Sequence, residues 1–525
     1  MNNELISDIL FDNECQEQLM KGVTTLSKAI KSTMGPMGRI VIIESPNETR
    51  GVLHTKDGYK VSRSINLLNP VQNLAATILK EASANTATDA GDGSTNAIVL
   101  AEALIVAGND KIKEGANRTQ ILRYMDEVVG EVVDILKEKS IPCDESTVLD
   151  VATISANNDE VLGKIIADTY KEVGENGIVT VEKSLTTETS YEVVKGLKID
   201  RSYTSPQFIN NVEKEEWVAN DVYILMCDHE ISSHDQIKNV LEPIIATNKK
   251  LLIIAPCTSG FLNFMVFNYK KEKIDTCIVA PPNFGYKMQE EMEDIAISIG
   301  ANYYSQHLGS DLSLIQFKDL GFAEKVIVGR KQTVIIGGNG NKELVEKRAN
   351  ELRASLENRT LKHEKDFILK RIASLIGGIG VIYVGGLTDL IQKETIDRCD
   401  DAVLAVKSGM EEGIVSGAGK ALWEINIPLK EGKPKEYAIA LEIVLKAIKE
   451  PLQQILINAD LDYKTFYNKS TLQGEGYNLK TEEFGNLIKL GVVDATKVVR
   501  TALQNACSVA TTILSTNVSI NITRA

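Results

Sequence analysis

The spacing of apolar residues changes twice along this chain of 525 residues. Up to about residue 138, and again from residue 342, apolar residues recur every three or four positions, which predicts helices. Between about 175 and 340, short β-rich runs alternate with helical segments, as in an α/β domain. Since two helical ends flank an α/β middle, we expect the ends to form one discontinuous domain with the middle inserted into it. The predicted helical segments include 14–32, 71–88, 97–107, 120–137 and a long charged pattern over 343–376.

Composition and charge narrow the class of protein. With 43% apolar and 25% charged residues, the chain has the composition of a folded, water-soluble protein of several domains. A net charge of −14 would repel a phosphate backbone, so we expect no nucleic-acid partner. The chain lacks a signal-peptide pattern and a membrane-length apolar stretch, and its seven cysteines form no CxxC pair. We therefore expect a cytoplasmic protein with no membrane contact, disulfide framework or zinc cluster.

A glycine-rich turn, Ala90–Asn96, stands directly before the apolar helical segment that begins at Ala97. Glycines let a backbone approach a ligand, and Ser94 and Thr95 offer hydroxyl groups to a helix end or to a phosphate. Asp92 suits a hard cation such as Mg²⁺. The alternative for so short a motif is an ordinary helix cap without a ligand.

Other glycine-rich segments give weaker signals. Thr33–Arg39 and Lys56–Gly58 are each, taken alone, ordinary turns. The segment Gly413–Lys420 lacks the Walker A spacing, and Gly337–Gly340 is not completed to GxGxxG. We therefore expect neither a P-loop nor a Rossmann nucleotide site.

Taken together, these turns occur with other segments in the order and approximate spacing of the group I chaperonins of the GroEL type, which the chain resembles over essentially its whole length. The matching segments are Thr33–Arg39, Lys56–Gly58, Ala90–Thr95, Ile154–Asn157, Asp200–Pro206, Gly377–Ile382, Glu411–Val415, Gly476–Asn478 and Asp494–Gln504.

The resemblance implies a multidomain α and α/β fold. A helical equatorial ATP-binding domain would comprise 1–138 and 412–525, and a small intermediate hinge domain 139–194 and 380–411. An α/β apical domain that binds polypeptides would comprise 195–379. The implied activity is that of an ATP-dependent chaperone and ATPase, with ATP and Mg²⁺ as cofactors and K⁺ as an optional second cation.

The resemblance also implies roles for individual residues. Asp92 would bind Mg²⁺, Asp401 would align the attacking water, and Asp57 would be a second acidic participant, because hydrolysis needs a cation to spread phosphate charge and a carboxylate to orient water. The phosphate cradle would be Gly93, Ser94 and Thr95, with Thr33, Gly35 and Pro36 opposite. Asn478 and Asp494 would contact adenosine and ribose. Further implied nucleotide contacts are Met34, Lys56, Asn96, Ser155, Gly417, Ala418 and Leu479.

Three residues depart from the family pattern at this site. Ser94 and Asn96 stand where threonines are usual, and Ala418 replaces a glycine that approaches the nucleotide. Ser94 keeps a hydroxyl group, so we expect phosphate binding to survive, whereas the added methyl group of Ala418 would alter affinity modestly.

The segment Gly260–Tyr269 is apolar on nearly every face, which is typical of a buried helix. The resemblance implies instead that part of it lines a ring opening that binds non-native chains. The implied polypeptide-binding residues are Tyr203, Phe208, Leu241, Leu262, Val266, Phe267 and Asn268. Gln207 and Lys238 stand where the pattern has an aromatic residue and a leucine, so we expect a more polar rim.

The implied assembly is a heptameric ring that accepts non-native protein clients and, optionally, a co-chaperonin lid. Gln453 occupies the position of an arginine that usually faces an acid across two rings, although Asp462 keeps an acid. A second usual pair has its signs exchanged in Asp110 and Lys435. We therefore expect a single ring or a weakly paired double ring.

Two other functions compete with an ATP-driven folding ring. One is a ring scaffold that shields polypeptides without nucleotide, against which Asp92, Asp401 and the glycine-rich turns argue. The other is an ATPase or kinase acting on a small molecule, which would need a P-loop or a kinase signature.

Overall fold

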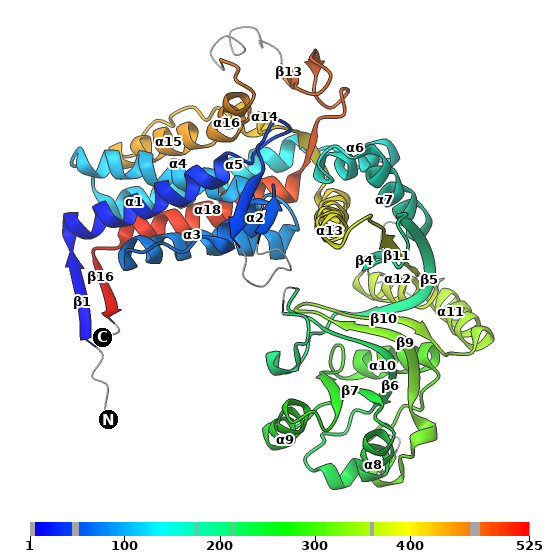
Figure 1. Ribbon diagram of the computed structural model, residues 1–525. Helices are drawn as coiled ribbons and strands as arrows, with labels where there is room; N and C mark the ends of the chain where they lie inside the picture. Colours follow the sequence, from blue (N-terminus) through cyan, green and yellow to red (C-terminus); the bar gives the residue numbers. More distant parts are fainter. Residues whose placement is uncertain are drawn as a thin grey trace. The chain divides into compact units, whose positions relative to one another are not determined.

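The computed structural model describes residues 6–44, 52–174, 177–212, 214–307, 309–357, 362–462 and 473–523 (Figure 1). The chain forms two compact units. The first comprises Met1–Asp168, Val181–Ser190 and Tyr383–Ala525, and the second comprises Thr169–Thr180 and Tyr191–Ile382. The expected insertion of an α/β middle between two helical ends is confirmed, whereas the boundaries of three separate domains stay a prediction.

The first unit is built around long helices from both ends of the chain. Its core helices are α1 (Asp12–Lys31), α3 (Pro70–Ala90), α4 (Ser94–Lys113), α5 (Arg118–Lys139), α15 (Lys435–Ala447) and α18 (Thr496–Ser515). Each presents an apolar stripe, and fully buried side chains such as Leu26, Leu100 and Leu503 join one core. The C-terminal helix α18 packs against α3, α4 and α5, so the two chain ends fold together.

Shorter elements of the first unit surround these helices. Strand β1 (Ile6–Phe11) pairs antiparallel with β16 (Val518–Thr523), and β2 (Val41–Glu44) pairs with β3 (Val52–Thr55). The other elements are α2 (Gly58–Ser64), α6 (Glu145–Ser155), α13 (Asp389–Glu412), β12 (Ile414–Ser416), α14 (Lys420–Trp423), α16 (Glu450–Asn458), β13 (Glu475–Asn478), β14 (Glu483–Asn486) and β15 (Val493–Ala495). Helix α7 (Glu160–Val173) carries the chain from the first unit into the second.

The second unit is organised by a sheet with the strand order β4-β11-β5-β10-β9-β6-β7-β8. The strands are β4 (Ile178–Lys183), β5 (Ser190–Ile199), β6 (Trp217–Met226), β7 (Lys250–Ile254), β8 (Asp275–Val279), β9 (Gly321–Val328), β10 (Thr333–Gly338) and β11 (Gly378–Val384). Strands β6, β7 and β8 run parallel, and β7 is a nearly continuous buried run, as parallel strands covered on both faces require.

The helices of the second unit are α8 (Lys238–Ala246), α9 (Ser259–Lys270), α10 (Tyr286–Ile299), α11 (Lys342–Glu357) and α12 (Lys362–Ile376). The long charged pattern over 343–376 is thus two helices, with residues 358–361 outside the described part of the chain. Among the described residues, no helix is long and apolar enough to cross a membrane.

Candidate functional site

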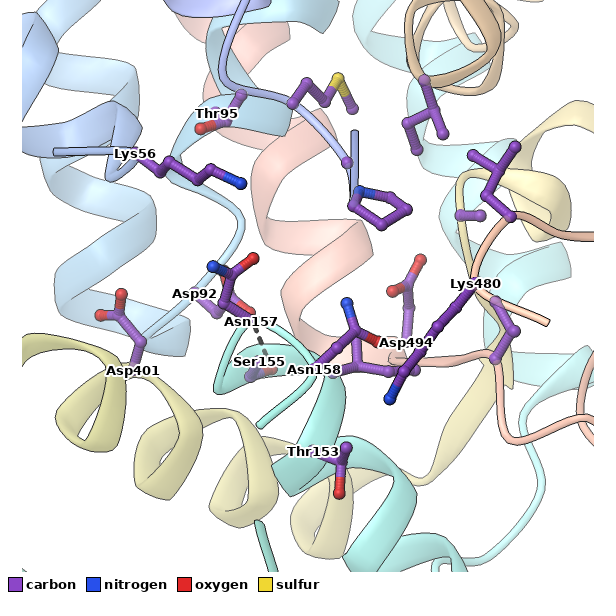
Figure 2. Close-up of a pocket in the computed structure, with 18 of the residues that line it drawn as sticks. Lys56, Asp92, Thr95, Thr153, Ser155, Asn157, Asn158, Asp401, Lys480 and Asp494 are labelled. Atoms are coloured by element: carbon purple, nitrogen blue, oxygen red, sulfur yellow. Dashed lines mark hydrogen bonds between the residues drawn. The ribbon is translucent and has the colours of Figure 1, made fainter. Parts of the chain in front are cut away.

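A cavity of about 780 Å³ opens within the first unit, and segments from both chain ends line it (Figure 2). Of the residues expected to bind nucleotide or hydrolyse it, all line this cavity except Gly417. Gly417 lies beside it, since its amide donates to Val492 O at 2.9 Å and Val492 is a lining residue. The structure therefore brings together residues that are up to about 460 positions apart in the sequence.

The turn between α3 and α4 needs its glycines. Gly91 and Gly93 have φ values of +82° and +83°, in the left-handed region that favours glycine. A Cβ atom at Gly91 would lie 2.0 Å from Leu404 Cβ, and one at Gly93 would lie 2.7 Å from Val498 Cγ1. The turn thus packs closely against α13 and α18 while it leads the chain into α4.

Helix α4 begins at this turn without a side-chain cap. Its N-cap is Gly93, which has no side chain to accept the first amide protons. Free amide groups at a helix N-terminus bind anions. Because Ser94, Thr95 and Asn96 all line the cavity, the first turn of α4 is suited to hold phosphate oxygens.

Asp92 is held in place from two sides. Its Oδ1 accepts from the amide of Gly93 at 2.5 Å, and its Oδ2 accepts from Ser155 Oγ at 2.9 Å (Figure 2). Ser155 is the last residue of α6. The carboxylate is therefore fixed at the cavity wall between α4 and α6.

Four carboxyl groups in the cavity share an unusual electrostatic environment. Desolvation raises the pKa of Asp57 and of Asp92. Desolvation, followed by repulsion from Asp57 and Asp92, raises the pKa of Asp401 well above its usual range. Desolvation and the nearby Asp92 raise the pKa of Asp494 to about 7. Carboxyl groups crowded in this way favour a bound cation, because it would stabilise their ionised forms.

The donor set fits Mg²⁺ bound together with a nucleotide. Among the described residues, no cluster of three or more His, Cys, Asp or Glu side chains forms a complete metal site. Mg²⁺ does not need one, since it is usually held by one or two carboxylates plus phosphate oxygens and water. Asp92, fixed beside the uncapped start of α4, meets that requirement.

Asp57 is the N-cap of α2, where its carboxylate accepts from the amides of Tyr59 at 2.8 Å and Lys60 at 3.2 Å. The adjacent Gly58 lets α2 approach α4, because a Cβ atom there would lie 2.0 Å from Thr95 Oγ1. Local helix capping thus orients the carboxylate that sequence analysis assigned as a second acidic participant.

Part of the cavity wall is less polar. Met34, Val99 and Ile455 form a small buried cluster against which Ala418 and Leu479 pack. Ala418 has a φ of +55°, a left-handed conformation that costs a non-glycine residue about 1–2 kcal/mol. Asn478 Oδ1 accepts from the amide of Lys480 at 2.9 Å, which fixes its side chain within the β13–β14 hairpin.

Sequence analysis did not single out several lining residues. Lys480 pairs with Glu160 at 2.8 Å, and Arg398 of α13 contacts Ala156 O at 3.5 Å and Asp159 at 3.6 Å. Asp397, one helical turn before Asp401, also lines the cavity. In the sequence, only the i, i+4 spacing from Asp401 indicates that Asp397 lies on the same face of the helix and could also reach the site.

The expected polypeptide-binding residues divide between core and surface in the second unit. Phe208, Leu241 and Val266 are 0%, 6% and 8% exposed, so their own unit covers them in this structure. Phe267 is 60% exposed. Tyr203, Leu262 and Asn268 are partly exposed.

Helix α9 exposes an aromatic residue that sequence analysis missed. Phe264 is 41% exposed, and its ring stacks on His234 with the centroids 4.8 Å apart. Phe261, Met265 and Val266 turn inward. The segment is therefore part buried helix and part exposed surface, with Phe264 and Phe267 at the surface.

Comparison with known proteins identifies the family. The sequence model of the TCP-1/cpn60 chaperonin family matches residues 26–522, and the chain belongs to this family. Two crystal structures of the chaperonin gp146 from the bacteriophage EL 2 (Pseudomonas aeruginosa), both in the presence of ATP-BeFx, share the fold. Crystal form II has a TM-score of 0.70 at 22% identity, and form I has 0.65 at 20%. Each match covers 98% of this chain and 99% of the other.

The expected fold class and family are thus confirmed. As a chaperonin, the protein is an ATP-driven chaperone, and its enzymatic activity is ATP hydrolysis.

Proposed function

We propose that the cavity of the first unit binds Mg²⁺·ATP and hydrolyses it, and that this hydrolysis drives the capture and release of non-native chains. The observation that supports the proposal most directly is the gathering of four desolvated carboxyl groups around the uncapped start of α4. Such a site combines carboxyl groups with free amide donors, which suits a metal–phosphate ligand.

Each group has a distinct task in this proposal. The amides and hydroxyl groups of Ser94 and Thr95 bind phosphate oxygens, and the apolar cluster with Leu479 receives the base while Asn478 and Asp494 contact the nucleoside. Asp92 holds Mg²⁺, which would spread the charge of the phosphates when bound. Asp401 accepts a hydrogen bond from the attacking water and orients it, with Asp57 beside it. K⁺ would be a second, optional cation.

The second unit would supply the polypeptide-binding surface. We assign this role to Phe267 and Phe264 first, with Tyr203, Leu262 and Asn268 at their margin. An exposed aromatic side chain binds apolar groups of a client without directional demands, since the hydrophobic effect is non-directional. Burial of a Phe side chain contributes roughly 1.5–3 kcal/mol. Phe208, Leu241 and Val266 would join this surface only after the unit rearranges.

The proposed assembly is a heptameric ring, single or weakly paired back to back, with protein clients and an optional co-chaperonin. Nucleic acid and membrane are not among its proposed partners. All seven cysteines lie within the described residues, and none of them forms a disulfide there, which supports placement in the reducing cytoplasm.

Phosphate release from the full-length protein tests the nucleotide proposal. Asp401→Ala is expected to bind Mg²⁺·ATP within about threefold of wild type yet hydrolyse it at least about tenfold more slowly, since only the water-orienting group is lost. Asp92→Ala should instead weaken Mg²⁺·ATP binding. Asp389→Asn, at the far end of α13, is the control and should change neither quantity.

An equal loss of binding in both variants would show that the roles are wrongly assigned. If wild type released no phosphate but still suppressed aggregation of a denatured protein, the nucleotide-independent scaffold would replace the present proposal.

A further inference from the structure

One ion pair joins the two helices that carry the proposed hydrolytic carboxylates. Lys60 Nζ of α2 donates to Asp397 Oδ2 of α13. The two side chains are 26% and 28% exposed, so the pair is largely withdrawn from water. An ion pair in such a place is screened less by salt than one on the open surface.

The partners stand one helical turn from the reacting positions. Lys60 of α2 follows Asp57, the N-cap of that helix, by three residues, and Asp397 precedes Asp401 by four residues on α13. At 3.6 residues per turn, each partner lies on the same helix face as its neighbouring carboxylate. The pair therefore fixes α2 against α13 beside the place where Asp57 and Asp401 face the cavity.

Without Lys60, the contact between α2 and α13 would bring the carboxyl group of Asp397 towards that of Asp57 with no cation between them. Asp57, Asp92, Asp400 and Asp397 all act on Asp401 by repulsion. Lys60 opposes this excess, since its charge is one of the factors that lower the pKa of Asp57. The lysine thus offsets a repulsion that would otherwise push α13 away from α2.

The same turn of α13 is also held from its other side. Arg398, the next residue, contacts Ala156 O and Asp159 in the turn between α6 and α7. A third ionic contact lies at the start of α13, where Lys183 and Asp389 pair at 2.7 Å with side chains 60% and 91% exposed. That pair is twelve residues from Asp401, about 18 Å along the helix.

We propose that Lys60 and Asp397 form a positioning clamp that holds α13 where Asp401 orients the attacking water. Loss of the clamp would slow hydrolysis and leave nucleotide binding nearly intact. The inference rests on the proposed function, because it assigns the pair to the hydrolysis that Asp401 and Asp57 would perform.

The test uses three variants of the full chain: Lys60→Gln, Asp397→Asn and the exchange Lys60→Asp/Asp397→Lys. We expect kcat to fall about tenfold in Lys60→Gln, because a small misplacement of a catalytic group is costly. The loss in Asp397→Asn should be smaller, since that change also removes one negative charge from the acidic group. The affinity for Mg²⁺ with a non-hydrolysed ATP analogue should stay within about twofold.

The exchange variant separates positioning from general damage. It restores an ion pair with opposite polarity, so we expect it to recover most of the lost kcat. Lys183→Gln and Asp389→Asn are matched controls, because they remove a similar pair from the same helix far from the cavity, and each should keep kcat within about twofold.

Three results would overturn the clamp: a Lys60→Gln variant with wild-type kcat, an exchange variant no better than the single variants, or a parallel loss of affinity and kcat. If any of these occurred while Asp401→Ala still lost hydrolysis, the proposed function would stand and the clamp alone would fail. Wild-type hydrolysis in Asp401→Ala would overturn both.

Discussion

The cavity of the first unit and the α9 surface of the second use burial in opposite ways. In the cavity, carboxyl groups are withdrawn from water, and the pKa of Asp494 rises to about 7 as a result. On α9, apolar rings are left in water, with Phe264 and Phe267 41% and 60% exposed. Each arrangement is unfavourable in the isolated chain, and each becomes favourable when a ligand of matching chemistry binds.

The two regions also differ in how the chain builds them. The cavity draws residues from segments throughout the first unit, so a change in any one element alters a shared geometry. The α9 surface comes from one helix whose residues divide between core and solvent. A convergent polar site therefore depends on the whole unit, whereas an exposed apolar face depends on which residues the local packing leaves outside.

The largest expected effect tests how the aromatic residues of the second unit divide between its core and its surface. Phe208→Ala should lower the free energy of unfolding by about 3–5 kcal/mol, because Phe208 is fully buried and packs against Tyr269. Phe267→Ala should cost less than about 0.5 kcal/mol. Denaturant unfolding of the two variants measures this difference.

Client capture should depend more on the exposed Phe267 than on the buried Phe208, which is the reverse of their order for stability. Phe267→Glu is expected to abolish suppression of aggregation while ATP hydrolysis persists, because every bound client would have to desolvate a charge. Phe264→Glu should weaken capture similarly, and Asn263→Glu, an exposed neighbour on α9, is the control. Undiminished capture by both phenylalanine variants would mean that α9 is not the client surface.

Sequence analysis predicted elements and the polar site better than the apolar surface. The helical periods anticipated α1, α3, α4 and α5, because each has one apolar stripe that the core must cover. The cavity residues were expected from the family resemblance, which rests in part on glycine-rich turns, and the close packing at Gly91 and Gly93 leaves one of these turns little freedom to vary. Periodicity alone gave no sign that these turns would meet.

The apolar surface was harder for a physical reason. Every face of Gly260–Tyr269 is apolar, so hydrophobicity does not tell which side meets the sheet. Val266 and Phe267 are adjacent in sequence, yet one is 8% and the other 60% exposed. Likewise, Lys60 and Asp397 are 337 positions apart, and only the fold brings them together.

The pH dependence of stability tests the electrostatic environment of the cavity. Asp494 has a pKa near 7 in the folded protein against 3.8 as a model value, so between these values the folded state binds more protons than the unfolded state. The unfolding free energy of the ligand-free protein should therefore fall as pH rises from about 4 to 7, by a few kcal/mol at most.

Thermal unfolding of the full-length protein at pH 5.5 and pH 8 measures this slope. Asp494→Asn should flatten it, because the amide does not titrate, although Asp57, Asp92 and Asp401 would keep part of it since their pKa values are also raised. Asp311→Asn in the second unit is the control, since the pKa of Asp311 is lowered from 3.8 and its titration lies below the tested pH range, so this change should leave the slope as it is. A ligand-free protein that is more stable at pH 8 than at pH 5.5 would contradict the electrostatic account of the cavity.

The smallest expected effect concerns the pairing of two rings. The first unit would make these contacts, and they involve neither the cavity nor the α9 surface. Gln453, partly buried in α16, cannot replace the charge of an arginine, while Asp110 and Lys435 are exposed on α4 and α15. Exposed ion pairs contribute about 0–1 kcal/mol each, but a ring interface repeats each pair once per subunit, so a small loss per site becomes several kcal/mol in a heptamer.

We therefore expect back-to-back pairing that is weak, salt-sensitive or absent. Native mass measurement at low and high ionic strength, with and without ATP, would show single heptamers at high salt. Gln453→Arg should increase the double-ring fraction at low salt, because it restores a cation that can face Asp462 across the interface, whereas Gln504→Arg on α18 serves as a charge-matched control. A double ring that stays intact at high salt and sub-micromolar concentration in every nucleotide state would show that contacts other than these ion pairs hold the two rings together.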